Sequence, residues 1–350
     1  MPFYIDKQGL AASRGLQAQA DFIANARASN YRYEGDLAQR HGLAVNAGQI
    51  PAEVWRDFDN QTKQLMTSDE AGVLMNDLSP LSRNVNIGKI VSEYRQYSAD
   101  MGVRSSIDGQ HAKPVGHGTY DFDGALVLVH STQVGRNWRE LEGMRSEGFD
   151  ALLDDQAAGV RFVRRRMGDD FVNGTKDVKY KGYGSAGIKA HANTQALDLG
   201  ASGVNVNLTT TTKLAEAKKA FVSALKTLQG SDNNAVGNVT FYVSDDIWFN
   251  LMNMPTDTTV AATDDILTLV RRTPGIADIK RTDACSGNEF IGIILSAEYI
   301  RPIVGMPVTS TPIQRVTPMD DFHILVWAAS GLQIRADAKG RAGVLYASAA

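Results

Sequence analysis

Six consecutive residues, Gly182-Tyr183-Gly184-Ser185-Ala186-Gly187, match the pattern G-x-G-x-x-G. In dinucleotide-binding proteins this pattern joins a buried strand to a helix, whose free backbone amides hold the pyrophosphate. Here the preceding segment 176–181 reads Lys-Asp-Val-Lys-Tyr-Lys, which is too polar for a central parallel strand, and segment 188–193 is a weak helix former. We therefore interpret the segment as a crossing between domains. A nucleotide-dependent enzyme that uses Gly182 to Gly187 is a remote alternative.

No other residue pattern indicates catalysis or metal binding. The six histidines show no H-E-x-x-H spacing, and no serine lies in a G-x-S-x-G elbow. Acidic doublets such as Asp245-Asp246 suit helix ends better than a catalytic pair. The single cysteine, Cys285, excludes an internal disulfide and fits a buried structural residue. The sequence thus predicts a protein that is not an enzyme, with no catalytic residue, no metal site and no cofactor.

One charged cluster has two interpretations. It comprises Arg161, Arg164, Arg165 and Arg166, and Arg161 and Arg165 are four residues apart, so they share one helix face. The arginines can pair with acidic residues at helix spacing, namely Asp154, Asp155, Asp169 and Asp170. Alternatively, they form a basic stripe that contacts DNA phosphates without reading sequence.

Two long elements would position these arginines. Segments 90–94 and 125–129 have strand-like patterns and flank a polar, glycine-containing tip at 102–118, which predicts a projecting hairpin. From Trp138 to Phe171 apolar residues recur at helical spacing, which predicts a helix about 50 Å long. Interior glycines predict a bend or break, most plausibly near Gly148.

The remaining segments mix helices and strands. Helices are expected at 212–228 and 264–271, and Ser244 or Asp245 can cap another. Strands are expected at 238–243, 276–281, 289–295, 301–304, 323–329 and 332–336, and segments 64–88 and 175–210 are expected to be a connector and an irregular crossing. Without strict strand–helix alternation, this order indicates an α+β fold. The net charge of −3 gives no sign of a polyanion-binding protein. No apolar run reaches the 18 residues expected of a membrane span, and the N-terminal sequence gives no sign of a signal peptide.

Several segments resemble a known family. They are Val134-Gly135-Arg136-Asn137-Trp138-Arg139-Glu140, residues 148–158, Phe171-Val172-Asn173-Gly174, residues 183–193 and residues 298–305. Together they resemble the major capsid proteins of tailed bacteriophages, whose Hong Kong 97-type fold is also found in encapsulin shells. The resemblance covers most of residues 85–350, and the order of elements carries it more than any single motif.

The resemblance implies an α+β domain organisation. It comprises an N-terminal helical arm (1–62), a peripheral domain part (63–182) with an extended loop (90–130) and a spine helix (136–173), an axial domain (183–298), and return strands (299–350). The extended loop would contact neighbouring subunits through Arg95, Arg104, Asp108, His111 and Lys113. The arginine cluster on the spine helix would face packaged DNA.

The resemblance also implies a function. Hexamers and pentamers of the chain would form an icosahedral phage head around double-stranded DNA, within a virion assembled in the cytoplasm of a host bacterium. The expected partners are the chain itself, a portal protein, a scaffolding protein, the packaged DNA and, optionally, a decoration protein, but no membrane. An encapsulin-type compartment shell is the alternative from the same fold.

Overall fold

The computed structural model describes residues 71–98, 117–146, 150–257 and 264–349, together with the single positions 25, 27 and 107. The chain divides into two compact units, residues 1–64 and 65–350. The predicted N-terminal arm therefore lies outside the described residues apart from Asn25 and Arg27, which are helical and exposed.

A long four-stranded sheet has the order β1-β11-β12-β4. Its strands are β1 (Arg83–Asn84), β11 (Ile300–Pro312), β12 (Phe322–Ile334) and β4 (Leu128–Arg136). Only the pairing of β1 with β11 is parallel. The sequence predicted β11 too short and divided β12 into two strands, whereas β12 runs through Ser330-Gly331 without a break.

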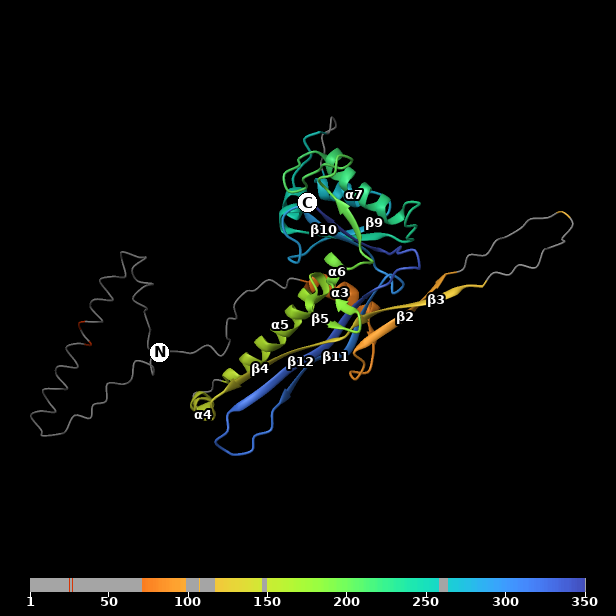
Figure 1. Ribbon diagram of the computed structural model, residues 1–350. Coiled ribbons are helices and arrows are strands. Elements are labelled where there is room, and N and C mark those ends of the chain that lie inside the picture. The colour runs from red at the N-terminus through yellow and green to blue at the C-terminus, as the bar shows by residue number, and fades with distance from the viewer. Residues whose placement is uncertain are drawn as a thin grey trace, which may run out of the picture. The chain divides into compact units, whose positions relative to one another are not determined.

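Two helices follow β4: α4 (Trp138–Ser146), which is separated from the strand only by Asn137, and then α5 (Ala151–Val172). Asp150 has a non-helical backbone and its side chain accepts a hydrogen bond from the Leu152 amide, so α5 begins with its own N-cap. The predicted interruption of the long helix near Gly148 is thus confirmed. The helix α5 runs along β4 and β12 (Figure 1). Its predicted apolar stripe faces the sheet, with Leu152, Val163 and Met167 packed in one cluster with Ile324, Val326 and Ala328.

A second, five-stranded sheet has the order β7-β13-β10-β8-β9. Its strands are β7 (Gln195–Asp198), β13 (Val344–Ser348), β10 (Glu289–Ile294), β8 (Val239–Val243) and β9 (Ile276–Arg281). Helices α7 (Leu214–Gln229), α8 (Asp245–Leu251) and α9 (Ile266–Arg271) contribute to its larger core, in which Phe221, Phe241 and Phe290 pack with ring centroids 5.1–5.6 Å apart. The predicted cap by Ser244 is present on α8. The mixed sheets and helices confirm the predicted α+β class.

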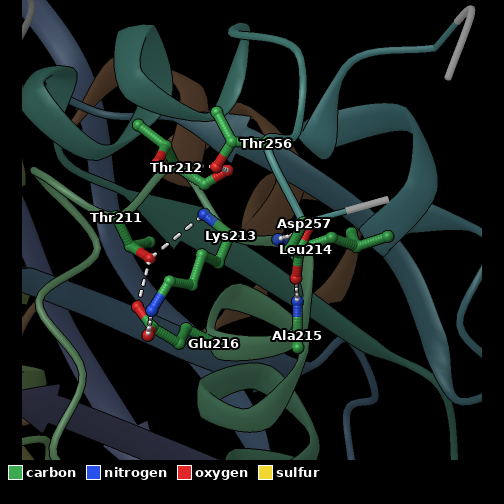
Figure 2. A network of polar contacts seen from close by, with 8 residues as sticks. All are labelled: Thr211, Thr212, Lys213, Leu214, Ala215, Glu216, Thr256 and Asp257. Atoms are coloured by element: carbon green, nitrogen blue, oxygen red, sulfur yellow. Dashed lines mark hydrogen bonds and ion pairs between the residues drawn. The ribbon is translucent and has the colours of Figure 1, made fainter. Parts of the chain in front are cut away.

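The N-terminus of α7 is capped from a distant segment. Its own N-cap residue, Lys213, offers no side-chain acceptor, and Asp257 accepts hydrogen bonds from the amides of Leu214 and Ala215 at 2.8 and 2.9 Å instead (Figure 2). These amides, the Ala215 amide first, hold the pKa of Asp257 below its usual range. Thr211 and Lys213 bind Glu216 beside it. This network fixes the segment before residue 258 to the helix.

The predicted connector contains a short helix, α3 (Gly72–Leu78), followed by the 3₁₀ turn η2 (Ser79–Leu81). Leu74 and Leu78 of α3 are buried in a core shared with the second sheet. Asp77 accepts hydrogen bonds from Tyr242 at 2.6 Å and from Lys280 at 2.7 Å. The helix α3 therefore joins the two sheets through apolar packing and a partly buried ion pair.

Segment 175–198, predicted as irregular, also has regular structure. It forms β5 (Thr175–Tyr180), β6 (Tyr183–Ser185), the four-residue helix α6 (Gly187–Ala190) and β7. Nearly all of β5 is exposed. Because β5 is almost entirely exposed, no apolar alternation marks this strand in the sequence.

Candidate functional site

The predicted projecting hairpin is present at its base. Strands β2 (Val91–Ser98) and β3 (Thr119–Leu126) pair in antiparallel register, from Val91 opposite Leu126 to Ser98 opposite Thr119. They form a sheet of two strands only and extend away from the rest of the unit (Figure 1). We call β2 and β3 the arm hairpin.

One face of the arm hairpin carries exposed aromatic side chains. Tyr97 pairs with Tyr120 across the strands, with ring centroids 5.1 Å apart, and Phe122 is the next residue on the same face of β3. Tyr97, Tyr120 and Phe122 are 52%, 64% and 57% exposed. Two-stranded hairpins are marginally stable alone, and aromatic clusters on a surface mark interaction sites. The aromatic face is therefore a candidate docking surface.

The root of the arm hairpin is fixed by a polar network. The Tyr94 hydroxyl on β2 donates to Asp123 on β3 at 3.0 Å and accepts a hydrogen bond from the Ala336 amide at 2.9 Å. The Asn193 side-chain amide donates both to Asp123, at 3.0 Å, and to the carbonyl of Ile334, at 2.9 Å. The direction of the arm hairpin is thus set by the end of β12 and by the crossing segment after α6.

Burial shifts the pKa values of two titratable groups at this root. Burial lowers the pKa of His191, and the nearby Asp123 opposes this shift. The His191 Nδ1 accepts a hydrogen bond from the Asn193 backbone amide at 3.0 Å, which requires an unprotonated Nδ1 and so agrees with the lowered pKa. Burial likewise raises the pKa of the Tyr94 hydroxyl, so this residue stays a hydrogen-bond donor to Asp123.

The predicted contact residues of the hairpin are only partly covered by the structure. Arg95 lies exposed on β2 opposite Phe122, on the aromatic face. Arg104, Asp108, His111 and Lys113 lie outside the described residues. The sequence interpretation missed Tyr97, Tyr120 and Phe122, although their alternation along the two strands was a usable signal.

The helix arginines occupy several environments. Arg161 is exposed, and Arg164 is exposed and donates to the side chain of Asn76 at 2.7 Å. Arg165 is half-buried, whereas Arg166 is exposed and forms an ion pair with Asp169. Two of the predicted acidic partners bind other residues instead. Asp155 binds Arg136, and Asp170 accepts hydrogen bonds from Thr175 and Ser185.

The geometry around the 182–187 loop differs from that of a dinucleotide site. Lys181 and Gly182 have positive φ angles and form the tight turn between β5 and β6. Gly187 approaches Gly174, where an added Cβ would lie 2.4 Å from the Gly174 nitrogen. These glycines serve a hairpin turn and a close backbone contact, and α6 is too short to present a row of free amides.

The part of the chain that the structure describes offers neither a metal site nor an exposed cysteine. No group of three or more histidine, cysteine or acidic residues there is arranged to hold a metal ion. Cys285 is buried, and burial raises its pKa to about 12, which makes a reactive thiolate unfavourable. None of the described helices is both long enough and apolar enough to span a membrane.

Comparison with solved structures defines the fold. The chain is similar to "The capsid of Myoviridae Phage XM1", with a TM-score of 0.64, 11% identity and coverage of 87% of this chain and 99% of that chain. It is also similar to a structure described as the capsid of a native GTA particle (TM-score 0.58, 12% identity, 88% and 99% covered) and to one described as Mycobacterium phage Che8 (0.52, 13%, 87% and 98%). The chain thus has the Hong Kong 97-type capsid fold that its sequence resembles.

Within that fold class, the chain belongs to a family described as "Family of unknown function (DUF6260)", whose model matches residues 44–347. No curated protein sequence matches the chain.

Proposed function

We propose that this chain is a major capsid protein, which assembles as hexamers and pentamers into the icosahedral head of a bacteriophage. The observation that carries the proposal is the arm hairpin, which presents exposed aromatic side chains on a fold shared with capsid structures. A subunit that works alone gains nothing from such a face, whereas a shell subunit can bury it against a neighbour.

The chemistry of the aromatic face suits a subunit contact. Tyrosine and phenylalanine rings bury about 150–250 Å² each and are common anchors at interfaces. At roughly 25 cal/mol per Å² of apolar surface, covering the three rings offers several kcal/mol before the costs of association. Repeated around a closed shell, contacts of this size hold many subunits together through multivalency.

The polar network at the root supports the same role. A contact made at the end of a long hairpin depends on the direction in which the hairpin points. Tyr94, Asp123 and Asn193 connect its two strands to β12 and to the crossing segment. In the proposed shell these residues position the aromatic face for the adjacent subunit.

The arginine cluster supports a second part of the proposal, a weak attraction for packaged double-stranded DNA. Arg161 and Arg164 are exposed on α5, on sides of the helix that do not face the sheet. Such exposed cations contact phosphates without reading bases and respond strongly to salt. The proposal places this side of α5 toward the inside of the shell.

The remaining partners follow from the proposed role. A head that fills with DNA needs a portal protein, and correct closure favours a scaffolding protein, with a decoration protein as an optional addition. The chain would act in the virion after assembly in the bacterial cytoplasm. None of these roles requires catalysis by the chain.

The composition of native particles tests the proposal. Particles from cells that produce this protein are expected to contain the chain as their most abundant protein, together with nuclease-protected double-stranded DNA. Particles that contain a protein cargo and no DNA would instead support the encapsulin-type compartment. Absence of the chain from any particle fraction would contradict both assignments.

A further inference from the structure

Three arginines lie on the same face of the four-stranded sheet, one on β1, one on β11 and one directly after the end of β12. Arg83 on β1 is opposite Ile303 on β11, and Arg301 is the next residue of β11 on that face. Arg301 is opposite Gln333 on β12, and Arg335 is the next residue on the same face, where its amide continues the ladder to the Tyr299 carbonyl. We call Arg83, Arg301 and Arg335 the arginine triad.

The arginine triad lies beside the root of the arm hairpin. The Arg335 guanidinium stacks over the Tyr94 ring, 4.9 Å from its centroid, and donates one hydrogen bond to the Ala297 carbonyl at 3.3 Å. Gln333, between the arginines on this face, is buried and donates to the Ser92 carbonyl of β2 at 3.1 Å. The triad is therefore held by the same strands that fix the arm hairpin.

The three arginines lack direct carboxylate partners in the described part of the chain. None of its three guanidinium groups forms an ion pair with a described carboxylate, and the Arg335 Nε is buried with no acceptor among the described residues. Burial, followed by the positive charges of Arg335 and Arg83, lowers the pKa of Arg301. By contrast, Arg136 at the other end of the sheet binds Asp155 and Glu140, and its pKa is raised.

We propose that Arg83, Arg301 and Arg335 form a binding site for a phosphate-class oxyanion. Guanidinium groups present planar pairs of donors that match phosphate oxygens in bidentate fashion. A dianion balances more of the triad's charge than one carboxylate does, and its several oxygens can accept hydrogen bonds from more than one arginine at once. The phosphate can be a free ion or belong to a nucleic acid backbone.

Occupancy of the site has a structural consequence for the arm hairpin. Arg335 packs on Tyr94, and Tyr94 bonds to Asp123 on the opposite strand. An anion that immobilises Arg335 therefore also stabilises the root from which the aromatic face projects. This inference concerns a ligand site on the subunit and holds whether or not the chain assembles into a phage head.

Calorimetric titration of the full-length protein with inorganic phosphate tests the site. Sodium chloride at matched ionic strength controls for general screening. We expect saturable binding of phosphate that weakens by at least about tenfold in Arg301→Gln, because a charge-assisted bidentate partner is lost. Arg83→Gln, at an exposed position, is expected to weaken binding in the same direction without affecting the fold. Arg139→Gln, an exposed arginine of α4, is the matched control and is expected to bind as the parent does.

Two results would overturn the proposal. One is a phosphate response no larger than that of chloride, and the other is equal phosphate affinity in Arg83→Gln, Arg301→Gln and Arg139→Gln. Should Arg301→Gln fail to fold, Arg83→Gln decides alone. Competition with a short DNA duplex identifies the source. If the duplex displaces phosphate from the parent protein and this displacement is lost in Arg83→Gln, the site binds a nucleic acid backbone. If phosphate binds and the duplex does not displace it, the site binds a free anion.

Discussion

Single residues fix the direction of the arm hairpin. Asn193 is the clearest case, because its one side-chain amide bridges Asp123 on β3 and the carbonyl at the end of β12. His191 adds a neutral acceptor for the Asn193 backbone. Neither residue has the surroundings of a catalytic group, and both have the geometry of positioning residues.

Asn193→Ala removes both side-chain bonds and leaves the Ile334 carbonyl and Asp123 with fewer donors. The free energy of unfolding is expected to fall by about 1–3 kcal/mol, as for other partly buried hydrogen bonds that lose a partner. Chemical denaturation measures this loss. Asn253→Ala, which removes one exposed side-chain bond to the Asn250 carbonyl, is the control and should change stability much less. Equal effects of the two variants would contradict the anchoring role of Asn193.

His191 makes the stability of the root depend on pH. Its pKa in the folded protein is below the ordinary value of 6.5, so the unfolded chain binds more protons as the pH falls through this region. Stability is therefore present above pH 6.5 and declines below it. His191→Asn keeps an acceptor for the Asn193 amide without a titrating group, and it should reduce this decline. Burial also lowers the pKa of His130, so part of the decline should persist. An unchanged pH profile in His191→Asn would refute this assignment.

At the scale of elements, the glycines of the long helix have different roles. In α4, a Cβ added at Gly143 would meet nothing within 4 Å. In α5, a Cβ at Gly168 would lie 2.8 Å from the Ala71 Cβ, so this glycine allows α3 to pack closely. The sequence predicted glycines that weaken and bend the helix, whereas at Gly168 the glycine also serves packing.

Alanine substitutions separate these roles. Gly143→Ala should stabilise the protein by up to about 1 kcal/mol through helix propensity. Gly168→Ala gains the same propensity but must displace Ala71, and a net loss of about 1–3 kcal/mol is expected. Thermal denaturation of the two variants compares them directly. The prediction is wrong if Gly168→Ala is as stabilising as Gly143→Ala.

The sequence predicted elements whose pattern is local. Strand-like patterns at 90–94 and 125–129 and the helical spacing from Trp138 to Phe171 indicated the arm hairpin and the long helix. The division of β12 failed because Ser330-Gly331 resembles a turn, whereas Gly331 lies in the strand where an added Cβ would be 2.0 Å from the Leu126 carbonyl oxygen. Such a glycine is required by a close approach that no local pattern reveals.

The sites were less predictable than the elements. Asn193 lies 70 residues from Asp123 and 141 residues from Ile334, so the anchor exists only after folding. The arginine triad likewise combines residues from β1, from β11 and from the segment directly after β12. The arginine cluster of α5, by contrast, is evident in the sequence as a run of arginines. The hydrogen-bond partners of these arginines depend on α3 and on the sheet.

At the scale of the whole molecule, the aromatic face should affect assembly and leave folding intact. The triple variant Tyr97→Ser, Tyr120→Ser and Phe122→Ser removes exposed rings, so the melting temperature of the subunit should change little. Particle formation should be lost or strongly weakened, as judged by electron microscopy. Tyr97→Phe with Tyr120→Phe keeps the rings and is expected to assemble normally. Normal particles from the triple variant would exclude the aromatic face as a required contact.

Sedimentation velocity of the purified chain over a range of protein and salt concentrations distinguishes a self-assembling subunit from a monomer. We expect species far larger than the 37.9 kDa subunit, which correspond to capsomers or closed shells, with sizes that electron micrographs of the same samples confirm. A single 37.9 kDa monomer under every condition would contradict the proposal that this chain builds a capsid.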